Sequence, residues 1–271
     1  MNFEVGGENL RTGSAGAVAL RLVGGRNVTS HNTPCRICSL RDVCLPCDLM
    51  PGAPVDAHAP MIADRDIRQG ETLFQTGDAL RFLYTVRSGF FKSVKTLGPG
   101  REQVIGFHMA GDMLGADAIG PLVHGCQAVA LEDSRVCAIL YARIEDLGDR
   151  APRLQHRLSR VMSAQIVGEH RAMLLLGVMS AGERVAVFLL GLSQRLELLG
   201  YSRSEFILRM TRGEIGSFLG LQVETVSRTL SRMRDDGLIS TDQKRIQILD
   251  HHGLKRCLRQ GLDTGSGCRS P

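Results

Sequence analysis

Eight cysteines are distributed unevenly along the chain, and their spacing is the first feature that suggests chemistry. Cys35, Cys38, Cys44 and Cys47 lie within thirteen positions, whereas the other four are scattered, as Cys126, Cys137, Cys257 and Cys268. Thiolates are ligands that zinc and iron–sulfur clusters prefer, and disulfides are rare in reducing compartments. The crowded segment therefore predicts metal or cluster binding rather than a disulfide framework.

A second candidate site is a helix-turn-helix in the C-terminal third of the chain. Thr211 and Glu214 form a capping box, in which each side chain can bond the backbone N–H of the other at the start of a helix. Gly220 then supplies a tight turn, and a second helix follows. The buried face of that second helix, at i, i+4 and i+7 spacing, consists of Val226, Leu230 and Met233.

The exposed side of this second helix carries residue types that can read DNA. An arginine binds guanine through two hydrogen bonds in the major groove, and a glutamate accepts a hydrogen bond from cytosine. The turn at residues 244–245, between two closing strands, would act as a wing that touches the DNA backbone. The candidate DNA-binding residues are Glu224, Thr225, Ser227, Arg228, Arg212 and Arg232.

Charge and composition are compatible with such a partner but do not identify it. The 271 residues carry a net charge of +5, and 43% of them are hydrophobic and 23% charged, as is typical of globular proteins. No apolar run approaches the roughly 18–20 residues of a membrane helix. Arg21 interrupts the apolar stretch near the N-terminus, so we expect no signal peptide, no membrane partner and a cytoplasmic protein.

Short apolar segments in the first half of the chain indicate a β domain. Segments rich in β-branched and aromatic residues occur at 72–74, 82–86, 90–94, 104–107 and 136–140. Glycine-containing turns separate them at intervals that are typical of a barrel or sandwich. We therefore predict an α+β protein whose N-terminal half is a β-roll.

A long helical pattern begins at Pro152 and continues to about Met179. One of its apolar stripes repeats at steps of three and four residues, the seam spacing of a coiled coil, which predicts a homodimer. The predicted seam consists of Leu158, Met162, Ile166, Glu169, Met173 and Leu176. In a two-fold dimer Glu169 would approach its own copy, so either this repulsion holds the dimer near dissociation or the side chain reaches water at the seam edge.

These patterns divide the chain into six parts. We expect a disordered tail at 1–30, a cysteine-rich arm and linker at 31–60, a β-roll at 61–148, and a dimerisation helix at 149–180. A winged helix-turn-helix follows at 181–250. The remaining residues, 251–271, read as a polar C-terminal tail in which Cys257 and Cys268 have no specific role.

The order of β-roll, long helix and winged helix-turn-helix resembles the CRP/FNR superfamily of transcription regulators. The segment VETVSR at residues 223–228 is similar to the reading helix of its FNR branch, named for fumarate and nitrate reduction regulation. The resemblance covers roughly residues 35–250 and includes RSG at 87–89 and GFH at 106–108. It implies a jelly roll like that of cyclic-nucleotide-binding domains, a cytoplasmic homodimer, double-stranded DNA as partner, and recruitment of RNA polymerase.

The resemblance also implies how the DNA is read. Arg228 would read the G·C pair of a TTGAT half-site, and Glu224 and Ser227 would complete the readout. Two half-sites would form an inverted repeat, one for each subunit of the dimer.

The same resemblance assigns the cysteines. Cys35, Cys38 and Cys44 have the spacing of the family's N-terminal cluster motif, and Cys137 would be the distant fourth ligand. The implied cofactor is a [4Fe–4S] cluster, which four thiolates can hold. The implied function is oxygen sensing, in which the cluster favours the DNA-binding dimer and oxygen removes it.

Cys47 departs from the family's pattern and leaves alternatives open. With Cys35, Cys38 and Cys44 it completes a CxxC-x₅-CxxC motif, which could bind zinc locally or replace Cys137 as a cluster ligand. A zinc- or thiol-stabilised regulator would bind DNA without responding to oxygen. A metalloenzyme would need convergent acid–base groups near the cysteines, and the sequence shows none, so we expect no enzymatic activity.

The loop at residues 121–128 bears on the ligand of the β-roll. It reads PLVHGCQA and contains no arginine. A buried phosphodiester without a counter-cation is unfavourable, so we expect no binding of a cyclic nucleotide.

Overall fold

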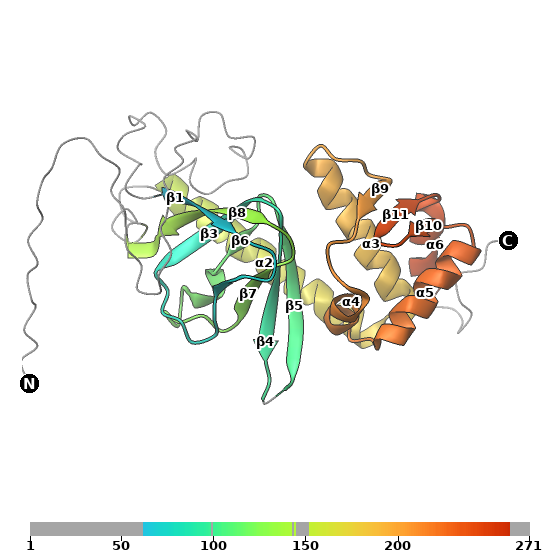
Figure 1. Cartoon of the computed structure of the whole chain (residues 1–271), viewed down its shortest axis with the longest axis horizontal. Helices are drawn as coiled ribbons and strands as arrows, with labels where there is room; N and C mark the ends of the chain where they lie inside the picture. Colours follow the sequence, from blue (N-terminus) through green and yellow to red (C-terminus); the bar gives the residue numbers. More distant parts are fainter. Residues whose placement is uncertain (1–61, 99, 143, 145–151, 261–271) are drawn as a thin grey trace, which may run out of the picture.

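The computed structural model describes residues 62–98, 100–142, 144 and 152–260. The strands of the N-terminal half gather at one end of the molecule and the helices of the C-terminal part at the other, with α2 (Pro152–Val178) passing between them (Figure 1). This arrangement confirms the predicted α+β architecture. The four N-terminal cysteines Cys35, Cys38, Cys44 and Cys47 lie outside the described residues, as do the expected tail at 1–30 and the arm at 31–60.

The β domain consists of two four-stranded antiparallel sheets that share one core. One sheet has the strand order β1-β8-β3-β6 and the other β2-β7-β4-β5. Val86 of the first sheet and Phe91 of the second are both fully buried in the core between the sheets. The strand bounds are β1 (Ile62–Ile67), β2 (Thr72–Phe74), β3 (Phe82–Ser88), β4 (Phe90–Thr96), β5 (Glu102–Met109), β6 (Met113–Leu114), β7 (Gln127–Ala130) and β8 (Ser134–Leu140).

All five strand segments predicted from the sequence lie within observed strands, whereas β1, β6 and β7 were not predicted. Strand β1 has the sequence IADRDI, which lacks the usual pattern of a strand because half of its residues are charged. Its acids are paired within the same sheet: Arg87 Nη1 lies 2.5 Å from Asp64 Oδ2, and Arg135 Nε lies 2.6 Å from Asp66 Oδ1. Cross-strand ion pairs thus take the place of the expected apolar alternation.

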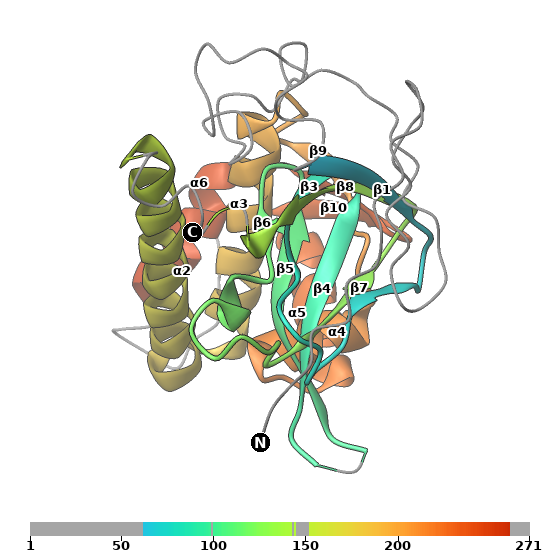
Figure 2. The ribbon, with the colours of Figure 1, turned by 90° about the vertical axis from the view of Figure 1, so that its left-hand side faces the viewer.

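Helix α2 has the predicted bounds, and its two faces have different surroundings. Leu158 and Val161 pack against a cluster of the β domain that includes Leu83 and Ile139. Further along, seam residues are exposed: Met162 by 39%, Ile166 by 51%, Met173 by 69% and Leu176 by 47%. Figure 2 shows α2 along one side of the molecule. One predicted seam residue, Leu158, therefore contacts the β domain. The side chain of Glu169 is not among those that the structure describes.

The C-terminal domain is a winged helix-turn-helix with one more helix than expected. Its elements are α3 (Ala181–Leu198), β9 (Glu205–Ile207), α4 (Arg212–Leu219), α5 (Val223–Asp235), β10 (Ile239–Asp242), β11 (Arg245–Ile248) and α6 (His251–Gln260). The expected polar tail from residue 251 onward was wrong as far as Gln260. Leu254 and Cys257, three residues apart on α6, are buried in the domain core, so the domain extends beyond residue 250. No helix in the described ranges is long and apolar enough to cross a membrane.

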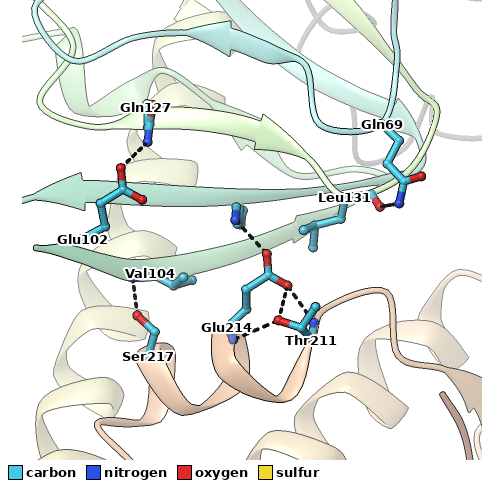
Figure 3. Close-up of polar contacts among 9 residues, drawn as sticks. Gln69, Glu102, Val104, Gln127, Leu131, Thr211, Glu214 and Ser217 are labelled. Atoms are coloured by element: carbon cyan, nitrogen blue, oxygen red, sulfur yellow. Dashed lines mark hydrogen bonds and ion pairs between the residues drawn. The ribbon is translucent and has the colours of Figure 1, made fainter. Parts of the chain in front are cut away.

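Helix α4 packs against the β4–β5 hairpin through polar contacts (Figure 3). Lys92 Nζ of β4 donates to Glu214 Oε1 at 2.7 Å. The backbone N–H of Val104 in β5 donates to Ser217 Oγ at 2.9 Å, and the side-chain amide of Gln103 donates to the carbonyl oxygen of Ser217. The first helix of the helix-turn-helix is therefore bonded to both strands of the hairpin.

An aromatic cluster supports the same contact. The ring centroids of Phe107 on β5 and Phe218 on α4 are 5.2 Å apart, and Phe188 of α3 lies 6.0 Å from Phe107. Arg195 of α3 donates to the carbonyl oxygen of Phe107 at 3.2 Å and forms an ion pair with Asp112. Helices α3 and α4 of the C-terminal domain thus meet strand β5 of the β domain in one partly buried interface.

Glu214 has two partners at this interface. While Oε1 accepts from Lys92, Oε2 accepts from the backbone N–H of Thr211 at 2.6 Å, which completes the predicted capping box. Burial raises the pKa of the Glu214 carboxyl, but the hydrogen bonds from Lys92 and Thr211 outweigh burial and hold the pKa below its ordinary value of 4.5. The carboxylate therefore stays ionised at neutral pH.

The ion pair between Lys92 and Glu214 should couple the two domains energetically. In a double-mutant cycle of Lys92→Met and Glu214→Gln, we expect a coupling of about 1 kcal/mol in the free energy of unfolding at pH 7. Glutamine keeps the capping box, so the cycle isolates the charge. Because the folded-state pKa of Glu214 is lowered, the coupling should be present above pH 4.5 and disappear as the pH falls through that lowered value.

The exposed pair of Arg203 and Glu197, with 3.6 Å between Nε and Oε2, is the matched control. Its coupling energy should be close to zero at pH 7 and also at a pH below the lowered pKa of Glu214. Equal coupling for the two pairs in urea-unfolding measurements would contradict a specific role for Lys92 and Glu214.

Candidate DNA-binding surface and cysteine ligands

Helix α5 separates an apolar face from a polar one, as predicted. Val226, Leu230 and Met233 are at most 2% exposed and pack into the core of the C-terminal domain. On the other side, the candidate DNA-binding residues Glu224, Arg228 and Arg232 are exposed, and Thr225 and Ser227 are half-buried. Gln222 precedes the helix without a side-chain cap, in keeping with its weak capping tendency. The structure therefore brings the five predicted α5 residues together along one helix.

Arg228 is available for an external partner. Its Nη2 lies 3.5 Å from Thr225 Oγ1, one turn earlier on the same helix, and it forms no ion pair with any carboxylate of the described residues. Arg234, by contrast, is bonded to Asp235 with a distance of 2.8 Å from Nη2 to Oδ1. Of these two arginines, Arg228 has the uncommitted guanidinium that recognition of a base edge requires.

The turn before α5 depends on two glycines. Gly220 adopts the left-handed conformation, with φ of 63°, and closes helix α4. Gly216 packs against the next segment so closely that a Cβ atom there would lie 2.6 Å from the carbonyl oxygen of Leu221. The backbone N–H of Leu221 in turn donates to the carbonyl oxygen of Gly216 at 2.8 Å. This close approach sets the angle at which α5 leaves α4.

Arg212 lies at the start of α4 and not on α5. It is half-buried, and its Nη1 atom is buried without a hydrogen-bond partner among the described residues. A buried donor without an acceptor is unfavourable, so an anion bound beside it would satisfy it.

The predicted wing is the turn between β10 and β11. Gln243 has a positive φ of 51° at this turn, and Lys244 and Arg245 are exposed. Arg245 Nη1 is bonded to Glu205 Oε1 of β9 at 2.6 Å. Lys244 is therefore the better candidate for contact with the DNA backbone.

Cys137 is the one proposed cluster ligand within the described residues. It lies in the middle of β8 and is 9% exposed. Its Sγ lies 3.6 Å from Asp64 Oδ1 on β1, and in the strand register Cys137 pairs with Asp64 and Ile139 with Ile62. The chain that carries the N-terminal cysteines thus enters the sheet two residues from Cys137.

Asp64 was not identified from the sequence, because nothing in the pattern of β1 links it to a cysteine 73 positions later. Among the described residues, no group of three or more His, Cys, Asp or Glu side chains is placed to hold a metal ion. The other proposed ligands Cys35, Cys38 and Cys44, and the alternative Cys47, lie outside these residues, as does Cys268.

The loop that would hold a cyclic phosphate is organised around a carboxylate. Asp117 Oδ2 accepts from the backbone N–H of Gly125 at 2.8 Å and lies 3.6 Å from Cys126 Sγ. His124, 3% exposed, stacks on Phe74 with centroids 3.9 Å apart. Burial, together with Asp117, raises the pKa of the Cys126 thiol to about 12. Cys126 therefore stays neutral and is a poor metal ligand.

His108 is also occupied within the β domain. Its Nε2 lies 2.8 Å from Ser93 Oγ, across the β4–β5 pair. Burial lowers the pKa of His108, so the imidazole is neutral at physiological pH. We interpret it as a hydrogen-bonded strand residue and not as a metal ligand.

Comparisons with known proteins match both halves of the chain. Residues 64–151 match the cyclic nucleotide-binding domain family, and residues 183–257 match the Crp-like helix-turn-helix domain family. The fumarate and nitrate reduction regulatory protein of Escherichia coli K12 is 41% identical over 220 residues, which cover 81% of this chain and 88% of that protein.

Two further relatives give the same picture. The transcriptional regulatory protein btr of Bordetella pertussis is 40% identical over 227 residues, with 83% of this chain and 93% of that protein covered. Among solved structures, FixK2 from Bradyrhizobium japonicum superposes with a TM-score of 0.67 at 28% identity, over 76% of this chain and 99% of that one.

Proposed function

Because the chain belongs to the CRP/FNR family of transcription regulators, we propose that it is an oxygen-responsive member whose [4Fe–4S] cluster promotes binding to an inverted DNA repeat. It is a DNA-binding regulator and not an enzyme. The observation that carries the oxygen-sensing part is the position of Cys137. It lies in β8 beside β1, the strand that directly follows the cysteine-rich segment.

The cluster ligands would be Cys35, Cys38, Cys44 and Cys137. Cys137 fits this role because it lies in β8, and the neighbouring strand β1 begins just after the arm. When bound, the cluster supplies an oxygen-sensitive link between the arm and the β domain. Oxidation would release the arm and leave largely monomeric protein.

The dimer would form along α2. Met162, Ile166, Met173 and Leu176 are exposed at seam spacing, and exposed apolar residues in such a row favour a partner helix. A second copy of the chain fits best because the seam pattern pairs with itself under two-fold symmetry. Two linked reading helices then bind at high effective concentration, so a single half-site should bind weakly.

DNA reading would follow from the exposed face of α5. Arg228 would bind the guanine of a TTGAT half-site, with Glu224, Thr225 and Ser227 completing the contact. Arg212 and Arg232 would bind phosphates and so orient the domain on the duplex. Because phosphate contacts carry no sequence information, the sequence specificity would come from Arg228, Glu224, Thr225 and Ser227.

The β domain would not bind a cyclic nucleotide, although it matches that domain family. The loop that should hold the phosphate, residues 121–128, contains no arginine, and the backbone N–H of its Gly125 is already bonded to Asp117. A second anion beside this carboxylate would be repelled.

RNA polymerase is the further partner that the family suggests. The turn between β4 and β5 is exposed, with Leu97 58% exposed and Arg101 at its edge. This projecting hairpin would be the contact surface, and it lies on the same two strands that hold α4.

Replacement of Cys137 tests the cluster directly. Anaerobically purified protein should contain about four iron and four sulfide per chain, with visible absorption that bleaches in air as the dimer is lost. Cys137→Ser should remove the iron and sulfide, whereas Cys47→Ser should retain both. The reverse result would reassign the fourth ligand to Cys47. Zinc in place of iron, or equal operator binding with and without air, would reject oxygen sensing and leave the DNA-binding function intact.

Replacement of Arg228 tests the reading helix. Arg228→Ala should weaken operator binding by about 1–3 kcal/mol and relax the preference at the G·C pair of the half-site. Arg234→Ala is the control, because Arg234 is bonded to Asp235 and should change the affinity for all sequences alike. Fluorescence anisotropy with operator and single-base variants distinguishes them. Unchanged base preference in Arg228→Ala would remove Arg228 from the readout.

Replacement of Glu169 tests the seam. If Glu169 faces its own copy, Glu169→Ala should raise the aerobic dimerisation constant by about tenfold or more in sedimentation velocity experiments. Arg160→Ala, an exposed charge on the same helix but off the seam, should have little effect. No shift for Glu169→Ala would place this carboxylate at the water-exposed edge of the seam.

A further inference from the structure

One arginine joins three helices at the point where the dimerisation helix meets the helix-turn-helix. Arg184, in the first turn of α3, donates from Nε to the carbonyl oxygen of Met179 at 2.9 Å. Its Nη2 donates to the carbonyl of Leu176 at 2.9 Å, and its Nη1 donates to the carbonyl of Leu219 at 3.0 Å. Leu176 belongs to the last turn of α2, and Leu219 is the last residue of α4.

These acceptors are groups that a helix leaves unpaired. The last carbonyls of a helix have no intrahelical donor and carry partial negative charge, so a cation placed there is favourable. A guanidinium has five N–H donors in a rigid planar fork, which lets it serve the ends of two helices at once. A lysine in the same place has one nitrogen and cannot reach three separated carbonyls in fixed directions.

The apolar packing at the same point is equally close. A Cβ atom on Gly220, in the turn of the helix-turn-helix, would lie 3.0 Å from Leu176 Cδ2 and 3.5 Å from Arg184 Nη1. Leu176 is also a residue of the predicted dimer seam. The end of α2 therefore abuts the turn that orients α5, and Arg184 bonds the two together.

Arg184 is not needed to form α3 itself. The N-terminus of α3 is capped by Ser180 and Glu183, with the backbone N–H of Ser180 donating to Glu183 Oε2 at 2.8 Å. The helix is anchored by Val185 and Leu189, each 1% exposed, in the domain core. The arginine is half-buried, so water can reach the carbonyls when it is replaced.

We propose that Arg184 is a positioning residue for DNA recognition. By bonding the end of the dimerisation helix to the end of α4, it sets the separation of the two reading helices in the dimer, and so the preferred spacing between half-sites. This inference rests on the proposed function, since it requires a dimer that binds an inverted repeat. It predicts that replacing the arginine reduces the preference for one half-site spacing, while the affinity for a single half-site is retained.

The test measures how binding affinity depends on the spacing between half-sites. If Arg184 only stabilised the fold, its replacement would not change this dependence. Full-length protein is purified without oxygen as wild type, Arg184→Gln and Arg184→Lys. The probes are duplexes with two TTGAT half-sites at the wild type's best spacing, duplexes with one or two base pairs more or fewer, and a single half-site. Arg203→Lys, which changes an exposed arginine of the same domain, is the matched control.

For Arg184→Gln, we expect the affinity ratio between the best and the altered spacings to fall by about tenfold, with half-site affinity and dimer fraction within about twofold of wild type. Arg184→Lys should behave in the same way, because it keeps the charge but not the three bonds. Arg203→Lys should keep the wild-type ratio.

An unchanged spacing profile in both Arg184 variants would overturn the inference and leave the proposed function standing. An equal loss of affinity for every probe, half-site included, would overturn it as well, because it would show a general structural role. If wild-type protein binds the single half-site as tightly as any inverted repeat, the proposed dimeric function fails, and the inference fails with it.

Discussion

Helix α4 is the element through which the DNA-reading half is held on the rest of the chain. Glu214, near its N-terminus, binds Lys92, the ring of Phe218 packs on Phe107, and its last carbonyl accepts from Arg184. Charge-assisted hydrogen bonds are directional, so two of them, with the ring contact between them, leave α4 little freedom to rotate. The orientation of α5 follows, because the turn between α4 and α5 is closed by glycine contacts that no side chain could enter.

The β domain offers a short physical path from the proposed cluster ligand to the proposed dimer interface. Cys137 and Ile139 lie on the same strand, and Ile139 belongs to the cluster against which Leu158 and Val161 of α2 pack. A displacement of β8 at Cys137 would therefore reach α2 through packed side chains and without an intervening loop. Although Cys137 lies in mid-strand, this packing connects it to α2 in space.

The sequence predicted those parts of the fold whose signal is local. The capping box at Thr211, the turn at Gly220 and the bounds of α2 depend on neighbouring residues and were recovered. Strand β1 was not predicted because its charges pair with residues of strands distant in sequence. Helix α6 was not predicted because its short apolar stripe was taken for part of a polar tail. The contacts of Lys92 with Glu214 and of Arg184 with Leu219 could not be predicted at all, since each joins groups 35 or more residues apart that share no pattern. Helix faces could be assigned from periodicity, but the partners of those faces could not.

The double use of Glu214 has a consequence for domain exchange between related regulators. A DNA-binding domain transplanted from another family member keeps its own start to α4, but it meets the β4–β5 hairpin of the host. An acid three residues after the capping threonine and a hydroxyl three residues further on would match Lys92 and the backbone of Val104, as Glu214 and Ser217 do here. A graft with other residues at these two positions would leave a half-buried ammonium and a backbone N–H without acceptors. Compatibility of a chimera can therefore be judged from two residues on the graft and two on the host.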